Sequence, residues 1–307
     1  MIDRDPAAGF EKTRASKPAD SYRDRTGFDP NFLGLGRPVP LPRLSAGQAG
    51  QAAVVDRLAA GVDRFLLPYT HFSVVMNGAR KLPIFSAANI DGNALRPLAR
   101  TGDAWAYDPR IDRSLQAGDD VYVNTDLDRG HMTRRLDPVW GAPTVAALAD
   151  EDTFHFTNAC PQHKDLNRRE WVQLEDYILG NAQTEDLKVC VITGPVLAPS
   201  DRSFRGVLLP AEFWKLVVMV RKDTRRLSAT GYVLSHGHLL TGFESFAYDQ
   251  FKTYQVTLRS IELRTGLDFG DLKSFDPMPQ ARPAGGFETA GLAGTPKVIG
   301  GPADIVL

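Results

Sequence analysis

The sequence predicts an α+β protein with an antiparallel sheet, and three observations lead to this fold class. Strand-like segments at 71–76 and 82–88 flank Asn77-Gly78, a strong signal for a two-residue hairpin turn. Two further apolar runs, 187–193 and 213–220, are rich in Val and are typical of buried strands, and 227–234 is expected to be another strand. Helical patterns do not alternate regularly with these strands, so we expect hairpins mixed with helices instead of a parallel sheet.

Helical spacing is clearest at 165–179. Four apolar residues recur there at positions that share one face of a helix: Leu166, Trp171, Leu174 and Ile178. Gly180 follows them and is the expected stop. Helices are expected at three further places: 46–67, 143–148 and 260–264, the last before Gly266. Segment 119–124 is expected to be a short strand or a loop, and the alternation at 153–157 predicts a strand.

One main domain is expected at 46–277, between two irregular ends of this 307-residue chain. The first 45 residues contain six of the 21 prolines and show no sustained period, which predicts an extended proline-rich arm at 1–45. Glycine and proline also dominate 278–307, which predicts a Gly/Pro-rich tail along the surface. The arm is a candidate handle for regulation, and a simple wrap around the domain explains it equally well.

Composition excludes some classes of function. Lys and Arg number 36 and Asp and Glu number 37, so the net charge of −1 excludes a protein that holds nucleic acid by bulk positive charge. Local basic patches or a bound metal stay open. No apolar run is long enough to cross a membrane, and the N-terminus lacks the pattern of a signal or transit peptide. We therefore expect a cytoplasmic protein, or one exported by a route without a signal peptide.

One short run contains residue types suited to phosphate chemistry. In Asp128-Arg129-Gly130-His131, the glycine permits a bend or a close backbone approach and would present Arg129 and His131 together. Histidine can act as a general base near neutral pH, and arginine can stabilise a phosphate. Taken alone, this run is weak support, because a single histidine is more often structural.

The helix at 165–179 contains a second pair of polar residues. Asn167 and Glu175 are eight residues apart, so they lie about 80° apart in projection and about 12 Å apart along the helix axis. The helix could anchor itself with Trp171 and Leu174 while it presents an amide and a carboxylate at its edge. An amphipathic helix with two solvated polar residues explains the same pattern, and the helix alone favours that explanation.

In their order and spacing, these pieces resemble the DNA/RNA non-specific endonuclease family, which includes mitochondrial endonuclease G and secreted bacterial sugar-non-specific nucleases. The family signature is Asp-Arg-Gly-His, then Asn and Pro-Gln after a strand, then Asn, Trp and Leu-Glu on a helix. The sequence keeps each part: Asp128-Arg129-Gly130-His131, Asn158 with Pro161-Gln162, and Asn167, Trp171 and Leu174-Glu175. The resemblance covers roughly residues 65 to 275.

The resemblance implies a central antiparallel sheet flanked by helices, with a ββα-metal finger as the active site. In that finger His131 lies on the first strand or its edge, Asn158 ends the second strand, and Asn167 to Glu175 form the helix. The implied activity is hydrolysis of phosphodiester bonds in DNA and RNA with little sequence preference. No step of that reaction uses a 2′-hydroxyl, and the new ends are expected to carry 5′-phosphates.

The resemblance also implies roles for the signature residues. His131 would be the general base, and Arg129 and Asn158 would hold phosphate or backbone geometry. Asn167 would be the one direct protein ligand of a Mg²⁺ ion, for which Mn²⁺ is expected to substitute, and Glu175 would act on that ion through water. Asp128 and Gly130 would support the motif. Which group orients the imidazole is not visible in the sequence.

Other basic residues are candidates for phosphate contacts. Arg134 and Arg135 follow the motif directly, and Arg168 lies beside Asn167. Arg100 lies upstream of Trp105, where similar nucleases have an arginine that contacts the scissile phosphate, although the spacing differs here. Solvated surface arginines are an equally good explanation for each. Some relatives have a further arginine four residues after the glutamate, where this chain has Leu179.

Two other functions compete with that of a nuclease. A catalytically silent nucleic-acid-binding or interaction module on the same fold would be marked by loss of His131 or Asn167, and both are present. An enzyme of the same type acting on another phosphodiester is separable only with a panel of substrates. Because an active nuclease would attack the genome of its own cell, we expect an inhibitor, a delivery route or an activating partner. Relatives are often homodimers, so a homodimer is a further partner to test.

Overall fold

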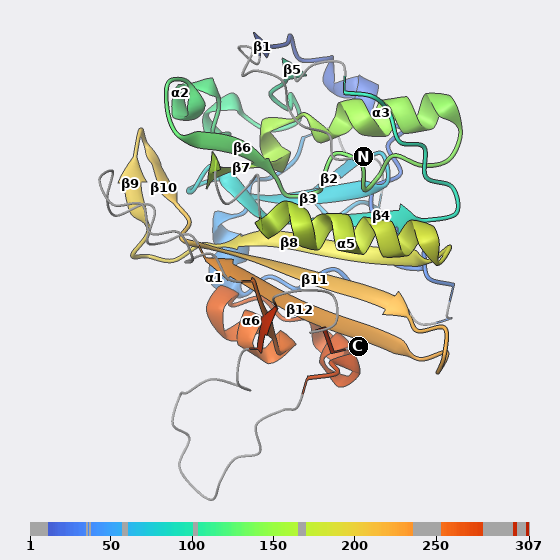
Figure 1. Ribbon diagram of the computed structural model, residues 1–307. Coiled ribbons are helices and arrows are strands. Elements are labelled where there is room, and N and C mark those ends of the chain that lie inside the picture. Colours follow the sequence, from blue (N-terminus) through green and yellow to red (C-terminus); the bar gives the residue numbers. More distant parts are fainter. Residues whose placement is uncertain are drawn as a thin grey trace, which may run out of the picture.

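The computed structural model describes residues 12–34, 36, 38–56, 61–100, 104–164, 170–235, 253–278, 297–299 and 305–306. Its centre is an eight-stranded sheet in the order β14-β13-β12-β11-β8-β4-β3-β2, in which every neighbouring pair is antiparallel (Figure 1). Its strands are β2 (Leu66–Tyr69), β3 (Phe72–Asn77), β4 (Leu82–Asp91), β8 (Lys188–Val196), β11 (Glu212–Val220), β12 (Leu227–Ser235), β13 (Thr253–Val256) and β14 (Lys297–Ile299). The predicted α+β class with a central antiparallel sheet is confirmed.

The alternation of side chains along the central strands β8 and β11 separates two of the hydrophobic cores. On β8, Val189 and Val191 belong to one core, whereas Cys190 and Ile192 belong to the other. Helix α5 (Glu170–Thr184) covers the first face, and helix α6 (Leu258–Thr265) packs on the second (Figure 1). Odd-numbered residues of β8 and β11 therefore lie on the α5 side of the sheet, and this arrangement positions the site described below.

The hairpin of β3 and β4 forms as predicted, but its turn is longer than the Asn-Gly signal indicates. Asn77 pairs with Leu82, so four residues, 78–81, make the turn. The Asn77 side chain accepts a hydrogen bond from the backbone N–H of Arg80 at 2.9 Å, and Lys81 has a φ of 59°. The asparagine therefore caps a loop instead of occupying its tip.

The predicted helix at 46–67 is mostly wrong. Helix α1 (Ala46–Gln51) is short and begins with a capping box at Ser45. Beyond it the chain runs along the sheet, because Ala53 N–H donates to Met76 O and Gly78 N–H donates to Gln51 O. Residues 57–60 lie outside the described chain, and by Leu66 the backbone is the strand β2. Pairing with β3 outweighs the helical spacing of the apolar residues.

The other helices differ from expectation mainly at their ends. Helix α3 (Pro143–Thr153) extends five residues past the predicted 143–148, and α5 continues through Gly180, where a stop was predicted. Helix α6 ends at Gly266, as predicted, and that glycine has a left-handed φ of 72°. Segment 119–124, expected as a strand or loop, contains the short helix α2 (Asp119–Tyr122).

The described part of the N-terminal arm packs against the domain. Strand β1 (Lys12–Thr13) pairs in parallel with β5 (Ala104–Trp105). Tyr22 is buried and its hydroxyl contacts Nε2 of His155 at 2.7 Å. The guanidinium of Arg25 donates to the buried carboxylate of Asp152 at 2.7 Å. These contacts join the arm to the loop that follows α3, close to the elements of the candidate site.

The remaining described elements are short: η1 (Ala19–Tyr22), η2 (Arg113–Leu115), η5 (Gly270–Phe275) and the hairpin of β9 (Arg202–Phe204) and β10 (Val207–Leu209). Most of the predicted C-terminal tail, 279–296, lies outside the described residues. None of the described helices has the length and apolar character needed to span a membrane.

Candidate active site

A two-stranded antiparallel sheet beside the main sheet contains the Asp-Arg-Gly-His run. Strand β6 (Leu127–His131) pairs with β7 (Ala159–His163) in an antiparallel register that places His131 opposite Ala159. The 3-10 helix η3 (Phe156–Asn158) lies directly before β7. Strands β6 and β7 and helix α5 thus follow one another in the order of a ββα finger, and residues 165–169, before α5, lie outside the described chain.

Asn158 precedes the second strand instead of ending it, and the predicted strand at 153–157 is wrong. Thr153 ends α3, and residues 156–158 form η3. The alternation of residue types suggested a strand with one polar face, but His155 and Thr157 are as buried as Phe156. Because neither face of this segment meets solvent, the period of two did not report a strand.

The amide of Asn158 is fully buried and bonded to backbone. Its Oδ1 accepts from Thr133 N–H at 2.8 Å, and its Nδ2 donates to Thr133 O at 2.9 Å and to Thr153 O at 3.0 Å. The Asn158 carbonyl also accepts from Met132 N–H at 2.8 Å. Of the two roles expected for Asn158, these contacts favour the one that holds backbone geometry, because they tie the chain just after His131 to the chain just before β7.

The close approach expected at Gly130 is present. A Cβ atom on this glycine would lie 2.0 Å from Oε1 of Gln162, a residue of the paired strand β7 whose side chain is fully buried. Any larger residue at Gly130 would therefore have to displace this glutamine. The Pro-Gln pair that the family signature places after a strand lies within β7 here.

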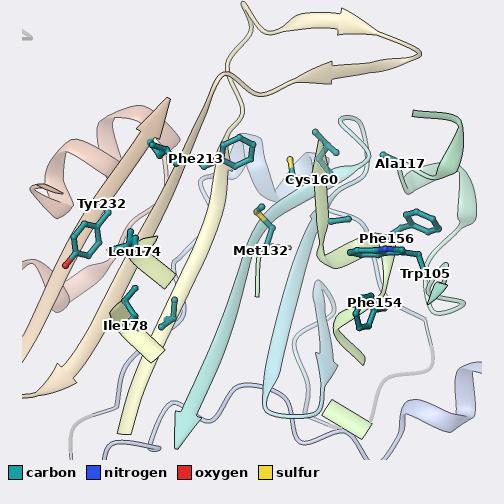
Figure 2. Close-up of a cluster of buried hydrophobic side chains, with 14 of the residues drawn as sticks. Trp105, Ala117, Met132, Phe154, Phe156, Cys160, Leu174, Ile178, Phe213 and Tyr232 are labelled. Carbon is teal, nitrogen blue, oxygen red and sulfur yellow. The ribbon is translucent and has the colours of Figure 1, made fainter. Parts of the chain in front are cut away.

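His131 ends β6 and is half-buried against two aromatic rings. Its ring centroid is 4.8 Å from that of Trp105 and 5.1 Å from that of Phe154, with the second pair edge to face. Met132, the next residue, is buried in the core on the α5 side of the sheet. Figure 2 shows Met132 between Trp105, Phe154 and Phe156 at one end of this core and Leu174, Ile178 and Tyr232 at the other. One continuous apolar core thus joins the β6–β7 strand pair, which contains His131, to α5.

Arg129 points toward α2. Its guanidinium donates to Asp119 Oδ1 at 2.6 Å and lies over the ring of Tyr122 at 5.2 Å from its centroid. The arginine side chain is only 10% exposed. A phosphate bound here would meet a guanidinium already oriented by a carboxylate and an aromatic ring. Asp128, on the same strand, is half-buried.

Glu175 lies on the face of α5 that meets the sheet, and it is buried. Its Oε1 accepts a hydrogen bond from Nζ of Lys215 at 3.2 Å, and its Oε2 lies 3.7 Å from Nε of Arg134. Lys215 lies on β11, is fully buried, and also donates to Oγ1 of Thr193 at 3.0 Å. The carboxylate of Glu175 therefore lies between two cations.

Asp137 is a further acid in this charged cluster. Burial raises the pKa of its carboxyl group to about 7, the cations Lys215 and Arg134 oppose that rise, and the Glu175 carboxylate reinforces it. Asp137 and Lys215 were not among the site residues predicted from the sequence. The one available signal was a lysine in the middle of a Val-rich apolar strand, where a charge is unusual.

The basic residues expected to bind phosphate differ in their surroundings. Arg134 and Arg135 are in intramolecular ion pairs: Arg134 with Asp176 and near Glu175, and Arg135 with Asp150 at 2.8 Å and with the carbonyl of Leu98. Arg100 is exposed. Arg168 lies outside the described residues, as does Asn167, the expected metal ligand.

In the part of the chain that the structure describes, no three His, Cys, Asp or Glu side chains gather as a metal site. The described donors suit an ion that is held mainly by water and substrate oxygens. Glu175, already paired with Lys215, suits a role in orienting metal-bound water better than direct ligation, because its negative charge is partly compensated.

The fold and this arrangement are those of a ββα-type nuclease. A model of the DNA/RNA non-specific endonuclease family matches residues 51–275, and the chain belongs to this family of metal-dependent nucleases. The fold is also similar to a chain in a crystal structure of the EndoG/EndoGI complex, which concerns the mechanism of EndoG inhibition. The TM-score is 0.55 at 20% sequence identity, over 75% of this chain and 94% of the other.

Several curated proteins are similar in sequence. The uncharacterized protein y4fB of Sinorhizobium fredii is 37% identical over 276 residues, which are 84% of this chain and 41% of y4fB. The human mitochondrial nuclease EXOG is 26% identical over 220 residues, which are 66% of this chain and 55% of EXOG. A nuclease from a Nostoc species is 24% identical over 214 residues, 67% of this chain and 73% of that protein. The chain thus spans less than two thirds of y4fB and of EXOG.

Proposed function

We propose that this protein is a Mg²⁺-dependent endonuclease that hydrolyses both DNA and RNA with little sequence preference and leaves 5′-phosphate ends. The observation that supports this proposal best is the β6–β7 strand pair. It holds His131 half-buried against Trp105 and Phe154, at a strand end whose continuation is fixed by Asn158. Beside it, Leu174 and Ile178 of α5 pack in the same apolar core, and the carboxylate of Glu175 on α5 pairs with Lys215.

In this proposal His131 removes a proton from the attacking water. Histidine is a common general base near neutral pH, which suits it to this step. The flanking rings restrict how the imidazole can turn, which keeps its nitrogens aimed in a fixed direction. Arg129 contributes a fixed positive charge from the same strand, oriented by Asp119 and Tyr122, to a phosphate oxygen.

A Mg²⁺ ion, bound directly by Asn167, would supply charge stabilisation to the phosphate and the leaving oxygen. Glu175 would hold water in that ion's shell by accepting hydrogen bonds. We further propose that Mn²⁺ substitutes for Mg²⁺, because both ions accept oxygen ligands. Besides His131 and Asn167, the chain contributes the Arg129 guanidinium, the Glu175 carboxylate and the backbone bonds of Asn158.

The decisive experiment is incubation of the purified protein with supercoiled plasmid and, separately, with RNA, each with Mg²⁺, with Mn²⁺ and with EDTA. We expect nicking of plasmid and degradation of RNA with either ion, and loss of both with EDTA. The products should accept a label from polynucleotide kinase only after phosphatase treatment, since their 5′ ends already bear phosphate. Binding of DNA without nicking would instead support a silent nucleic-acid-binding module. Cleavage of small phosphodiesters alone would support another substrate.

His131→Ala is the matching variant. We expect the turnover number to fall by about 10²–10⁴ while DNA binding and the melting temperature change little, because the general base is lost and the fold is not. His163→Ala, at the other end of the β6–β7 strand pair, is the control, and this variant should keep wild-type activity. An His131→Ala variant with more than about a tenth of wild-type turnover would remove His131 from this role.

We also propose that the enzyme is controlled by a partner, since an active nuclease endangers its own cell. An inhibitor protein, an activating protein and a second copy of this chain are the partners to test, in the cytoplasm or after export without a signal peptide. Light scattering of the purified protein gives the oligomeric state directly. A monomer in that experiment would exclude a stable homodimer.

A further inference from the structure

A buried lysine lies in the middle of the main sheet, directly under helix α5. Lys215 is fully buried, and its neighbours along β11, Trp214 and Leu216, are fully buried as well. Because side chains alternate along a strand, Lys215 lies on the same face as Phe213 and Val217, which belong to the core on the α5 side of the sheet. An ammonium group in such a place is costly unless it is paired and hydrogen-bonded.

Glu175 and Thr193 hold this ammonium group, and both come from elements that frame the site. Lys215 Nζ donates to Glu175 Oε1 at 3.2 Å and to Thr193 Oγ1 at 3.0 Å. Thr193 is the direct cross-strand partner of Lys215 on β8. The threonine hydroxyl therefore fixes the lysine side chain from the adjacent strand, and the lysine in turn fixes one oxygen of the glutamate on α5.

The same row of the sheet continues toward His131. Ser86 on β4 is the cross-strand partner of Thr193, and its hydroxyl is 2.6 Å from the hydroxyl of Thr133. Thr133 is two residues after His131 and is the residue that Asn158 binds through its backbone. One row of polar side chains across three strands thus contacts Glu175 at one end and the side chain of Thr133, two residues beyond His131, at the other.

Other charged groups also face this place. Arg134 Nε lies 3.7 Å from Glu175 Oε2, and its guanidinium is paired with Asp176, one residue further along α5. Asp137 is buried nearby and is influenced by both Lys215 and Glu175. Glu175 is therefore held from two sides, with Lys215 on Oε1 and Arg134 toward Oε2.

We propose that Lys215, fixed by Thr193, is a positioning residue that orients the Glu175 carboxylate for its role beside the metal. This inference rests on the proposed nuclease function. Apolar residues of similar size in the same place would give a core at least as stable, because a buried ion pair often contributes little or nothing to stability. The pair is therefore better explained by the fixed orientation that it gives the carboxylate than by stability.

The test uses Thr193→Val, because this change removes the hydroxyl and keeps the shape and charge of the cluster. We expect the turnover number to fall about 10-fold, within the 10–100-fold range of changes that act through another residue, while KM for DNA changes less than about threefold. Thr193→Ser, which keeps a hydroxyl, should recover activity to within about threefold of wild type. Thr230→Val, a buried threonine on β12 opposite Val217, is the matched control for loss of a hydroxyl from this sheet.

Two further measurements separate positioning from simple loss of structure. In a Glu175→Gln background, Thr193→Val should lower turnover by less than about twofold more, because residues that act as one unit are not additive. Calorimetric titration with Mn²⁺ alone, without substrate, should show affinity lowered about 10-fold by Thr193→Val. Lys215→Met is the more direct change, but it leaves the Glu175 charge buried and unpaired by lysine, so its effect on folding is expected to be large.

The outcomes are distinguishable from failure of the proposed function. If wild type cleaves nothing, or if Glu175→Gln cleaves as well as wild type, the proposed function or the role of Glu175 fails, and the Mn²⁺ titration still decides whether Thr193 influences the metal. If Glu175→Gln is impaired while Thr193→Val matches Thr230→Val in turnover and in Mn²⁺ affinity, the positioning role of Lys215 is overturned. Fully multiplicative losses in the double variant would also overturn it, since they place Thr193 outside the Glu175 unit.

Discussion

Replacement of Asn158 by alanine removes one buried amide and with it three hydrogen bonds to backbone groups. The bonds lost are those to Thr133 N–H, Thr133 O and Thr153 O, at 2.8 to 3.0 Å. Each such bond contributes a net ~0.5–1.5 kcal/mol, so we expect the free energy of unfolding to fall by about 3 kcal/mol. For a domain of this size that corresponds to a melting temperature lower by about 6–12 °C.

Asn158→Asp makes the prediction sharper. The aspartate keeps an oxygen for Thr133 N–H, but its second oxygen would face two carbonyl oxygens, those of Thr133 and Thr153. The ionised variant should therefore be at least as unstable as alanine at neutral pH. Protonation restores one donor, so this variant should regain stability as the pH falls toward about 4, near the ordinary pKa of an aspartate.

Urea unfolding followed by circular dichroism, and plasmid nicking at a temperature where all variants are folded, measure the two effects separately. Asn181→Ala is the control, since that side chain makes one bond to Tyr177 O within α5 and alanine is a good helix residue. A melting temperature within about 2 °C of wild type, combined with a large loss of nicking, would refute the backbone role. It would place Asn158 in contact with phosphate instead.

Four other predictions concern single features of the structure. Gly130→Ala should lower the free energy of unfolding by about 1–3 kcal/mol in urea titrations, because its Cβ would lie 2.0 Å from Gln162 Oε1; unchanged stability would mean that the glutamine moves freely. Burial raises the pKa of Asp137 from 3.8 to about 7, so between about pH 4 and 7 the folded protein holds a proton that the unfolded chain has lost, and the stability from this group is complete below about pH 4 and lost as the pH rises through 7. Asp137→Asn should therefore flatten the fall in unfolding free energy between about pH 5 and 7, and an unchanged slope would contradict the raised pKa. Arg135→Ala should lower the melting temperature through loss of the Asp150 ion pair and leave the salt dependence of DNA binding unchanged, whereas a slope reduced by about one would show a phosphate contact. Asn167→Ala should weaken Mg²⁺ and Mn²⁺ binding sharply and Asn167→Asp should keep or raise it with poor turnover; calorimetry showing wild-type metal affinity for the alanine variant would move the metal elsewhere.

Local patterns predicted a large part of this molecule correctly. The runs at 187–193, 213–220 and 227–234 are the strands β8, β11 and β12, and the segments around Asn77-Gly78 are β3 and β4. These patterns succeed because a strand that is buried on both faces is mostly apolar and a hairpin needs a turn residue between its strands. They failed at 46–67 and 153–157, where pairing with distant segments and complete burial outweighed the local period.

The signature residues could also be recognised from the sequence alone, because they occur in a fixed order along the chain. The motif around His131, the Pro-Gln pair and the Leu-Glu pair on a helix were enough to indicate the family, and the family model matches 51–275. A chemical signature of this kind is visible in the sequence because the reaction requires particular residue types at nearly constant spacing.

The tertiary structure alone decided what surrounds these residues. Lys215 and Glu175 are 40 residues apart, and only the register of β11 with β8 and the docking of α5 bring their charged atoms to 3.2 Å. The same packing binds the Asn158 amide to backbone and places Arg134 beside Glu175. Such contacts depend on which elements pack together and in which register, and on how much water their packing excludes, and these are properties of the whole fold that no local window of sequence contains.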